Sequence, residues 1–381
     1  MEKTRKERVT EVLKRKDPGR FVYAPNYWQW FAHQKNHGLL PEEISSCNSQ
    51  LDLIQHLGLD VFSRNIYSDQ QAFWFGGLIH LDWDGIRVET DTQKGGHDTI
   101  VKKTYHTRCG TLTEHLRYQY RESTLVQEKF LVDDYASQLD AFEDMLQRCR
   151  FRFDLPRYEA VLKEVGDDGV VVAGEFYSPL KLLHIFLGPV NATYLIMDQP
   201  DRVRSLMDVH ETKQLALIKE VVSSGMESVM AMDNLDTMFH PPHYVEKYSA
   251  SFYEKASRIC HDHGATFFIH ACGQQKDNLK LISRLGVDGL EGVAFPSIGD
   301  VELDEAMEIS GDSFIITGGI SAMEIQNLKT RDEVFHYVED LFNRMRPYRH
   351  RFMLSASCNT PINTSWDTLK HFRDAWLEYG C

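Results

Sequence analysis

Short, nearly continuous apolar runs recur along the chain, and amphipathic stretches separate most of them. Such runs are typical of strands buried on both faces of a parallel sheet. We expect eight strands, at Phe21–Asn26, Asp60–Arg64, Val170–Phe176, Ser228–Asp233, Thr266–Ala271, Gly289–Ala294, Phe314–Gly318 and Phe352–Ser357. From the third strand onward, the amphipathic stretches predict helices at Arg202–Ser223, Pro242–His261, Lys276–Leu285, Asp304–Ser310 and Thr330–Met345.

Eight strands that alternate with helices predict a (β/α)8 barrel, an α/β fold, here formed by residues 1–381 as a single domain. A doubly wound open sheet is the alternative, but no Gly-x-Gly-x-x-Gly pattern follows an early strand. Between residues 78 and 120 apolar and polar positions instead alternate with a period of two, between turns that contain glycine. This pattern predicts an antiparallel insertion after the second barrel strand, close to the barrel mouth.

Polar side chains stand at or just beyond the ends of four of these apolar runs and inside a fifth. In (β/α)8 barrels the chemistry takes place at the carboxyl ends of the strands, where the βα loops meet. We therefore expect these side chains to gather at one mouth. They are Glu175, Asp233, Asn234, His270, Cys272, Glu291 and Cys358.

Three of these residues form a possible zinc site. Side chains two positions apart on a strand point the same way, so His270 and Cys272 can share one target, and Cys358 ends another strand. One imidazole and two thiolates leave the fourth zinc position open for a substrate, which is a catalytic arrangement. Free cysteines are also often simply buried in a core. Both interpretations stay open on the residues alone.

The remaining polar strand ends are candidates for supporting roles. Glu175 or Glu291 would supply a proton or a fourth ligand, with a salt bridge inside the barrel as the competing interpretation for each. Asp233 and Asn234 would orient the site or hold the strand end. His240 and His243 flank two prolines, and we expect them to be loop residues that begin the next helix, not a second metal site.

Composition and charge limit the classes of molecule that the protein is expected to bind and the compartment in which it is expected to occur. A formal net charge of −14 argues against nucleic acid as a general partner. No apolar run approaches the length of a membrane span, and the polar N-terminus lacks the apolar core of a signal peptide. Seven cysteines without disulfide-like spacing are typical of a reducing compartment, so we expect a cytoplasmic protein.

The chain resembles the uroporphyrinogen decarboxylase superfamily over nearly its whole length. The resemblance rests on the opening Arg5-Lys-Glu-Arg-Val, and on Leu57-Gly-Leu-Asp-Val-Phe, Met232-Asp-Asn-Leu-Asp, His270-Ala-Cys-Gly, Gly318-Gly-Ile and Cys358-Asn-Thr-Pro-Ile-Asn. True uroporphyrinogen decarboxylases need no metal and hold their substrate with an arginine-rich segment after the first strand. The corresponding segment here, residues 25–33, is aromatic and contains no arginine, which argues against porphyrinogen decarboxylation.

Within that superfamily the sequence resembles the corrinoid-dependent methyltransferases, in which His-x-Cys and a distant Cys bind zinc. The resemblance assigns zinc to His270, Cys272 and Cys358, and it implies a separate corrinoid protein whose cobalt exchanges the methyl group. One branch of the family methylates a thiol such as coenzyme M. Another consists of O-demethylases, which take the methyl group from a methoxylated aromatic compound. A lyase or a non-catalytic binding protein on the same barrel is the alternative from another class.

Aromatic residues after the first two strands favour the O-demethylase branch. A cluster of aromatic side chains at the mouth suits a flat ring, although packing of helices onto the barrel is the competing interpretation. The insertion also makes the chain longer than is usual for the thiol branch. The candidate substrate-binding residues are Tyr23, Tyr27, Trp28, Trp30 and Phe31, with Asn234 beside them at the mouth and Phe73-Trp74-Phe75 after the second strand.

Overall fold

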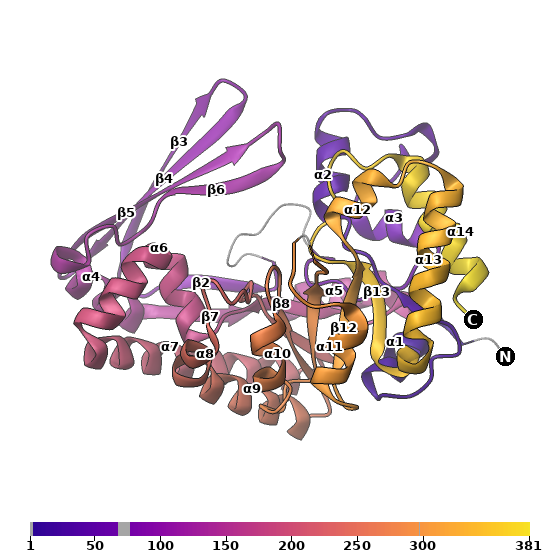
Figure 1. Cartoon of the computed structure of the whole chain (residues 1–381). Helices are drawn as coiled ribbons and strands as arrows, with labels where there is room; N and C mark the ends of the chain where they lie inside the picture. The colour runs from indigo at the N-terminus through magenta and orange to yellow at the C-terminus, as the bar shows by residue number, and fades with distance from the viewer. Residues whose placement is uncertain (1–2, 68–76, 297) are drawn as a thin grey trace.

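The computed structural model describes residues 3–67, 77–296 and 298–381, and its centre is a parallel sheet (Figure 1). Within these residues, seven strands pair in the order β1-β13-β12-β11-β10-β9-β8. The predicted α/β barrel with an antiparallel insertion is confirmed. The barrel strands are β1 (Val22–Tyr23), β8 (Val172–Phe176), β9 (Ser228–Ala231), β10 (Thr266–His270), β11 (Gly289–Val293), β12 (Ile315–Ile320) and β13 (Phe352–Ala356).

The segment predicted as the second strand, residues 60–64, occupies the gap between β1 and β8 without forming a regular strand. The Asp60 backbone N–H donates to the Tyr23 carbonyl at 3.0 Å, and the Val170 N–H donates to the Val61 carbonyl at 2.9 Å. A carboxylate oxygen of Asp60 accepts the Tyr23 N–H at 2.9 Å. A side chain thus replaces one backbone partner, so the ladder is reduced to a single bridge between Val61 and Gly169.

Helices surround this barrel (Figure 1). The predicted helix at 242–261 is two helices, divided at Ser249, whose hydroxyl hydrogen-bonds the Ser178 hydroxyl at 3.3 Å. The helices outside the insertion are α1 (Arg5–Leu13), α2 (Trp28–Asn36), α3 (Gln50–Leu57), α5 (Leu155–Val165), α6 (Pro179–Asp198), α7 (Pro200–Ser223), α8 (Pro242–Tyr248), α9 (Ala250–Asp262), α10 (Lys276–Ile282), α11 (Leu303–Ser310), α12 (Ala322–Asn327), α13 (Arg331–Met345) and α14 (Trp366–Tyr379), with 3-10 turns η1 (Glu42–Ile44), η2 (Gly166–Asp168) and η3 (Arg346–Arg351).

Helix α6 was not predicted, because its apolar residues do not follow an amphipathic period. Among the described residues it is the one helix that is long and apolar enough to cross a membrane, which corrects the expectation that no apolar run approaches that length. The fold buries 56% of the most apolar 18-residue stretch of α6. Gly188 breaks the helical backbone just before Pro189. A buried, kinked helix of this kind is typical of a protein core.

The antiparallel insertion is longer than its pattern predicted. It begins near residue 79 as expected but extends to residue 153 instead of 120, because β2 pairs with β7, about seventy residues later in the chain. Local alternation cannot reveal a partner so far away. The insertion consists of β2 (Ile79–Trp83), a four-stranded sheet of β3 (Arg87–Gly95), β4 (Asp98–Thr107), β5 (Gly110–Gln119) and β6 (Thr124–Lys129), then α4 (Tyr135–Arg148) and β7 (Cys149–Phe153).

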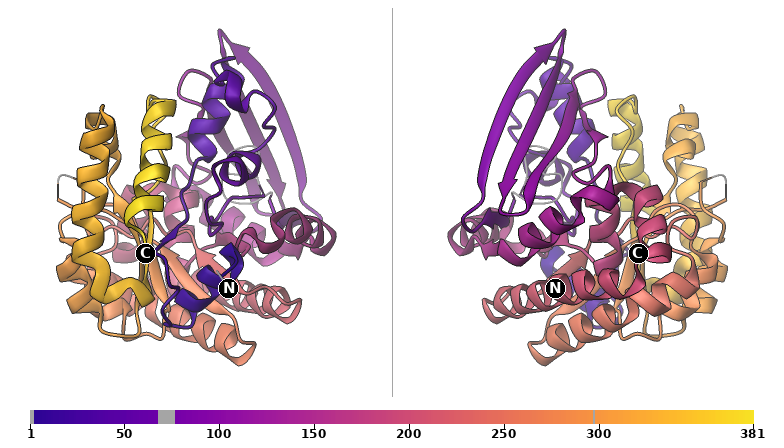
Figure 2. Two further views of the ribbon diagram at one scale, coloured as in Figure 1. Left: turned by 90° about the vertical axis from the view of Figure 1, so that its right-hand side faces the viewer. Right: turned by 90° about the vertical axis from the view of Figure 1, so that its left-hand side faces the viewer.

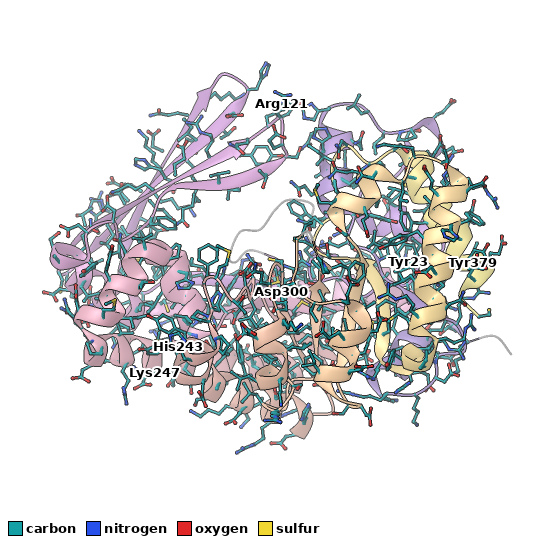
Figure 3. All side chains as sticks on the ribbon, viewed as in Figure 1. Tyr23, Arg121, His243, Lys247, Asp300 and Tyr379 are labelled. Atoms are coloured by element: carbon teal, nitrogen blue, oxygen red, sulfur yellow. The ribbon has the colours of Figure 1, made fainter. Side chains whose placement is uncertain are left out.

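The four-stranded sheet stands over the barrel as a thin layer (Figure 2). Its tip, which carries Arg121, reaches toward α2 (Figure 3). The Tyr120 hydroxyl donates to the Asn36 carbonyl at 2.6 Å, and a His37 ring nitrogen lies 3.0 Å from the Tyr120 carbonyl. The Gln29 amide donates to the Glu122 carbonyl at 3.2 Å. The sheet is therefore attached at both ends, to the barrel at its root and to α2 at its tip.

We predict that Asp288, at the start of β11, makes stability dependent on acidic pH. Its carboxylate accepts the Phe267 N–H at 2.8 Å and contacts His261 and Arg15. Burial alone would raise the pKa of Asp288, but these three partners hold it below its usual value. A carboxyl group with a depressed folded-state pKa stabilises the fold above its unfolded pKa of about 4, and this contribution is lost as the pH falls further.

Urea denaturation between pH 7 and pH 2 tests this prediction. Asp288→Asn should be less stable at pH 7, and its free energy of unfolding should fall less steeply below about pH 4. Asp312→Asn removes an exposed carboxylate, and its free energy of unfolding should change with pH as that of the wild type does. An unchanged slope in Asp288→Asn would contradict the prediction.

Candidate metal centre and adjoining cavity

His270 ends β10 directly beside Glu291 of β11, its register partner in the sheet. Both side chains are buried. The imidazole Nδ1 hydrogen-bonds a Glu291 carboxylate oxygen, and Nε2 lies 3.9 Å from the Cys358 sulfur. Metal-binding histidines are commonly held in this way, with a carboxylate on one ring nitrogen and the other nitrogen directed at the metal position.

The two cysteines complete this cluster from different strand ends. A hydrogen bond with Cys272, together with His270 and Arg64, holds the pKa of Cys358 well below its usual value despite its burial. The same hydrogen bond, with burial, raises the pKa of Cys272. The two thiols are therefore linked to each other, and His270 and Arg64 favour negative charge on Cys358.

Gly292, immediately after Glu291, lets the strand ends approach one another. Its φ is +95°, and a side chain at this position would come within 2.7 Å of the Ser357 carbonyl and 2.9 Å of the Ala271 carbonyl. These carbonyls belong to the residues just before the two cysteines. Glycine at this position is thus a condition for bringing Cys272 and Cys358 to His270.

The donor set fits zinc in its chemistry. Tetrahedral zinc with Zn–N and Zn–S bonds of ordinary length would place a nitrogen and a sulfur about 3.5 Å apart. The His270 Nε2 to Cys358 Sγ distance is 3.9 Å. Across residues 3–67, 77–296 and 298–381, no group of three His, Cys, Asp or Glu side chains is already drawn together at metal-binding distance. The three side chains would therefore have to move closer together to hold an ion.

Arg64 is part of the cluster, although the sequence analysis did not select it. Its Nη1 contacts a Glu291 oxygen at 2.5 Å, and its Nη2 lies 3.9 Å from the Cys358 sulfur. Burial alone would raise the pKa of Glu291, but Arg64 and His270 hold it below its usual value, so the group is a carboxylate. Arg64 ends the predicted second strand, and the rule that selected the other strand-end residues would have found it.

Glu291 therefore forms a buried salt bridge, which was the alternative to an acid role in the sequence analysis. The same carboxylate also orients His270. Glu175, at the end of β8, is occupied differently. Its oxygens accept the backbone N–H groups of Gly77 and Leu78, each at 2.7 Å, and that of Ile79 at 3.1 Å. Burial raises the pKa of Glu175 in spite of these bonds. Glu175 thus anchors the root of the insertion.

Asp233 and Asn234 follow β9. Asp233 is fully buried; it accepts the Ser178 N–H at 2.9 Å, where α6 begins, and it hydrogen-bonds the Tyr253 hydroxyl. This is the strand-end role considered for it. Asn234 is exposed, and its φ of +46° is a left-handed conformation that asparagine tolerates better than most residues. Lys181, which sequence reasoning missed, interacts electrostatically with Asp233 and Cys272.

The aromatic candidates divide into two groups. Tyr23, Tyr27 and Trp30 are each about 1% exposed and belong to the core. The two tyrosine hydroxyls hydrogen-bond each other at 3.0 Å, and the Trp30 indole donates to the Thr364 carbonyl at 2.8 Å. Packing explains these three residues.

Trp28 and Phe31 instead line a cavity of about 750 Å³ between α2 and the four-stranded sheet. The Trp28 indole N–H donates to the Asn359 side-chain oxygen at 2.6 Å, and Asn359 follows Cys358 in the chain. Trp28 of the cavity wall is therefore hydrogen-bonded to the residue that follows Cys358 in the chain.

Two further sequence predictions concern other segments. Phe73-Trp74-Phe75 lies outside the described residues. His240 is buried with its ring 4.9 Å from that of His184, whereas His243 lies in α8 on the outer side of the barrel (Figure 3). The two histidines flanking the prolines thus point to different environments, and His240 is a core residue instead of a surface loop residue.

We predict that removing Arg64 leaves the Glu291 carboxylate buried beside His270 alone. Arg64→Met should lower the free energy of unfolding of the metal-free protein by about 3–5 kcal/mol at neutral pH. The double variant Arg64→Met/Glu291→Gln should be more stable than the single variant, because no charge is then left without its partner.

Chemical denaturation measures both effects. Arg121→Met, at the exposed sheet tip, should change the stability by no more than about 0.5 kcal/mol. A double variant less stable than Arg64→Met would show that the ion pair is not what matters at this position.

Comparison with known proteins agrees with this architecture. A solved methyltransferase from Methanosarcina mazei matches with a TM-score of 0.61 over 100% of both chains, at 14% sequence identity. A psychrophilic glycoside hydrolase family 10 endo-beta-1,4-xylanase matches with a TM-score of 0.34 over 58% of this chain and 77% of its own, at 13% identity, which is too weak to support an argument. No curated protein sequence matches the chain. The sequence profile of uroporphyrinogen decarboxylase (URO-D) matches residues 116–379, more than half of the chain, and the chain therefore belongs to this family.

Proposed function

We propose that this protein is a zinc-dependent methyltransferase that moves a methyl group from a methoxylated aromatic substrate to the cobalt of a corrinoid carried by a partner protein. In this O-demethylase reaction the methyl–oxygen bond breaks and the methyl group goes to cobalt(I), which supplies both electrons of the new bond. The oxygen leaves as a phenolate and takes up a proton. Family membership and the fold shared with a methyltransferase support methyl transfer as the reaction class.

One observation carries the proposal: His270 is held by Glu291 through Nδ1, while its Nε2 faces the sulfur of Cys358. A carboxylate behind the imidazole and a cysteine sulfur in front of it form the arrangement in which a histidine commonly binds a metal ion. A zinc ion bound by His270, Cys272 and Cys358 would supply Lewis acidity toward the ether oxygen.

The residues around this centre have complementary tasks. Glu291 keeps the imidazole oriented, and Arg64 balances the charge of Glu291 and Cys358. Trp28 and Phe31 provide apolar surface for a ring in the neighbouring cavity. Asn234 is exposed beyond β9 and is available to a substrate.

Zinc content tests the metal assignment directly. The protein should bind one zinc ion, and His270→Ala, Cys272→Ala and Cys358→Ala should each lose most of it, because three protein ligands leave no spare partner. Cobalt(II) substitution should give thiolate-to-metal charge-transfer absorption that each cysteine variant weakens. Cys260→Ala, at a buried cysteine of α9, is the matched control and should retain the metal. Full zinc content in Cys358→Ala would exclude this cysteine as a ligand.

Methyl transfer tests the activity. Zinc-loaded protein, a panel of corrinoid proteins kept as cobalt(I) and methoxylated aromatic donors should yield methylcobalt(III), seen in the cobalt absorption spectrum, and an equal amount of phenol. Cys272→Ala should abolish both products. Methylation of a thiol from methylcobalt(III), without ether cleavage, would instead support the thiol branch. If neither reaction occurs with any corrinoid, the methyltransferase proposal is wrong.

A further inference from the structure

The tip of the four-stranded sheet, where Figure 3 labels Arg121, meets α2 through a row of aromatic rings. The ring centres of His33 and His37, at the end of α2, lie 4.4 Å apart, and that of His37 lies 4.4 Å from Tyr120 in the turn between β5 and β6. Tyr120 also stacks with His97, in the turn between β3 and β4, at 6.1 Å. This row, the histidine latch, joins α2 to both turns of the tip.

His33 faces a covered part of the tip. The Ser123 hydroxyl lies 3.5 Å from His33 Nδ1, and Ser123 is itself buried. The His33 side chain is only half-buried, at the end of the row. A proton added to His33 would therefore place a charge where water reaches it only in part, which is unfavourable without a nearby anion.

The two carboxylates at the tip already have cationic partners. Glu122 lies 3.7 Å from Arg121. Asp98 lies 3.6 Å from Arg117, and it also accepts the backbone N–H of the latch tyrosine at 3.1 Å. Lys35 of α2, which lines the adjoining cavity, is a further positive charge. The charges around the latch therefore give a protonated His33 little stabilisation.

These surroundings favour the neutral form of His33. Burial and the neighbouring His37 lower the pKa of His33, and Glu122 opposes them only in part. A sheet that has moved away from α2 would leave His33 in water, with the ordinary histidine pKa of about 6.5. The separated form thus binds the proton more readily. Contact between α2 and the tip is favoured above about pH 6.5 and loses stability as the pH falls below that value.

The sheet is attached more firmly at its root than at its tip. Besides the latch, the tip is joined to α2 by the hydrogen bonds of the Tyr120 hydroxyl and Gln29 and by that of the Asn36 amide to the Tyr118 hydroxyl, at 3.1 Å. All three lie at exposed positions, where water can replace either partner. At the root, β2 pairs with β7 along its whole length, and Glu175 binds three backbone N–H groups. The tip is therefore the end that separates first.

We infer that the four-stranded sheet is a lid over the cavity at α2, held closed by the histidine latch and released when His33 takes up a proton. Trp28 and Phe31, which line the cavity and are 7% and 4% exposed, become accessible on release. The inference concerns entry to the cavity and does not depend on the reaction proposed above.

Hydroxyl-radical footprinting, measured by mass spectrometry at single residues, tests the lid on the purified protein. Oxidation of Trp28, corrected for radical dose, should rise at least about threefold between pH 8 and pH 5.5, because one proton taken up on opening changes the ratio of open to closed forms by up to about tenfold per pH unit. Trp30, two residues away and in the core, should stay equally protected at both pH values.

Three variants identify the group that takes up the proton. His33→Gln keeps a polar side chain that cannot be protonated, so Trp28 oxidation should lose most of its pH dependence. His336→Gln, at an exposed histidine of α13, is the matched control and should keep the wild-type pH dependence. Glu122→Gln should move release to higher pH, because it removes the carboxylate that favours protonated His33 in the closed form.

The same Trp28 oxidation at pH 8 and pH 5.5 in the wild type, or an unchanged pH dependence in His33→Gln, would overturn the inference. A rise at Trp30 together with Trp28 would also overturn it, because α2 would then be unfolding. Release at lower pH in Glu122→Gln would show that His33 is not the group that takes up the proton.

Discussion

The buried carboxylate of Glu291 is the group on which the site depends. A carboxylate removed from water is costly unless it is paired and hydrogen-bonded, and here Arg64 and His270 are its partners. Arg64 comes from the segment that closes the barrel between β1 and β8, while His270 comes from the opposite part of the sheet. Closure of the barrel, orientation of the imidazole and the positive environment that Arg64 gives Cys358 are therefore parts of one electrostatic arrangement.

The same mouth holds the insertion in place. Glu175, at the end of β8, binds three consecutive backbone N–H groups at the start of the insertion. The far tip of the sheet is hydrogen-bonded to α2. Because both ends are attached, the inner face of the sheet is held opposite Trp28 and Phe31, and a cavity remains between them. Glu175, a candidate acid in the sequence, thus helps to position the sheet that forms one wall of the cavity.

The sequence revealed what depends on neighbouring residues and missed what depends on distant ones. Buried parallel strands are continuous apolar runs, so β8 to β13 were found, and strand-end rules brought His270 and Cys358 together. Residues 60–64 carry the same apolar signal but lack the regular ladder, since the Asp60 side chain replaces a backbone partner. The β2–β7 pairing joins residues about seventy positions apart, which no local alternation predicts. Aromatic identity also could not separate Trp28, at the cavity, from Trp30, in the core, because both lie on α2 two residues apart.

The barrel and the insertion provide different parts of the site, polar groups and apolar surface, for a physical reason. Converging strand ends can place an imidazole and two sulfurs within a few ångströms, and Gly292 removes the one Cβ that would keep them apart. Such a cluster offers a substrate little apolar area, because its neighbours are charged: Arg64, Glu291 and Lys181. An antiparallel sheet supplies the missing surface, since alternation places every second side chain on one face. In this chain the barrel therefore provides the cluster of His270, Cys272 and Cys358, and the face of β4 and β5 provides apolar area beside α2.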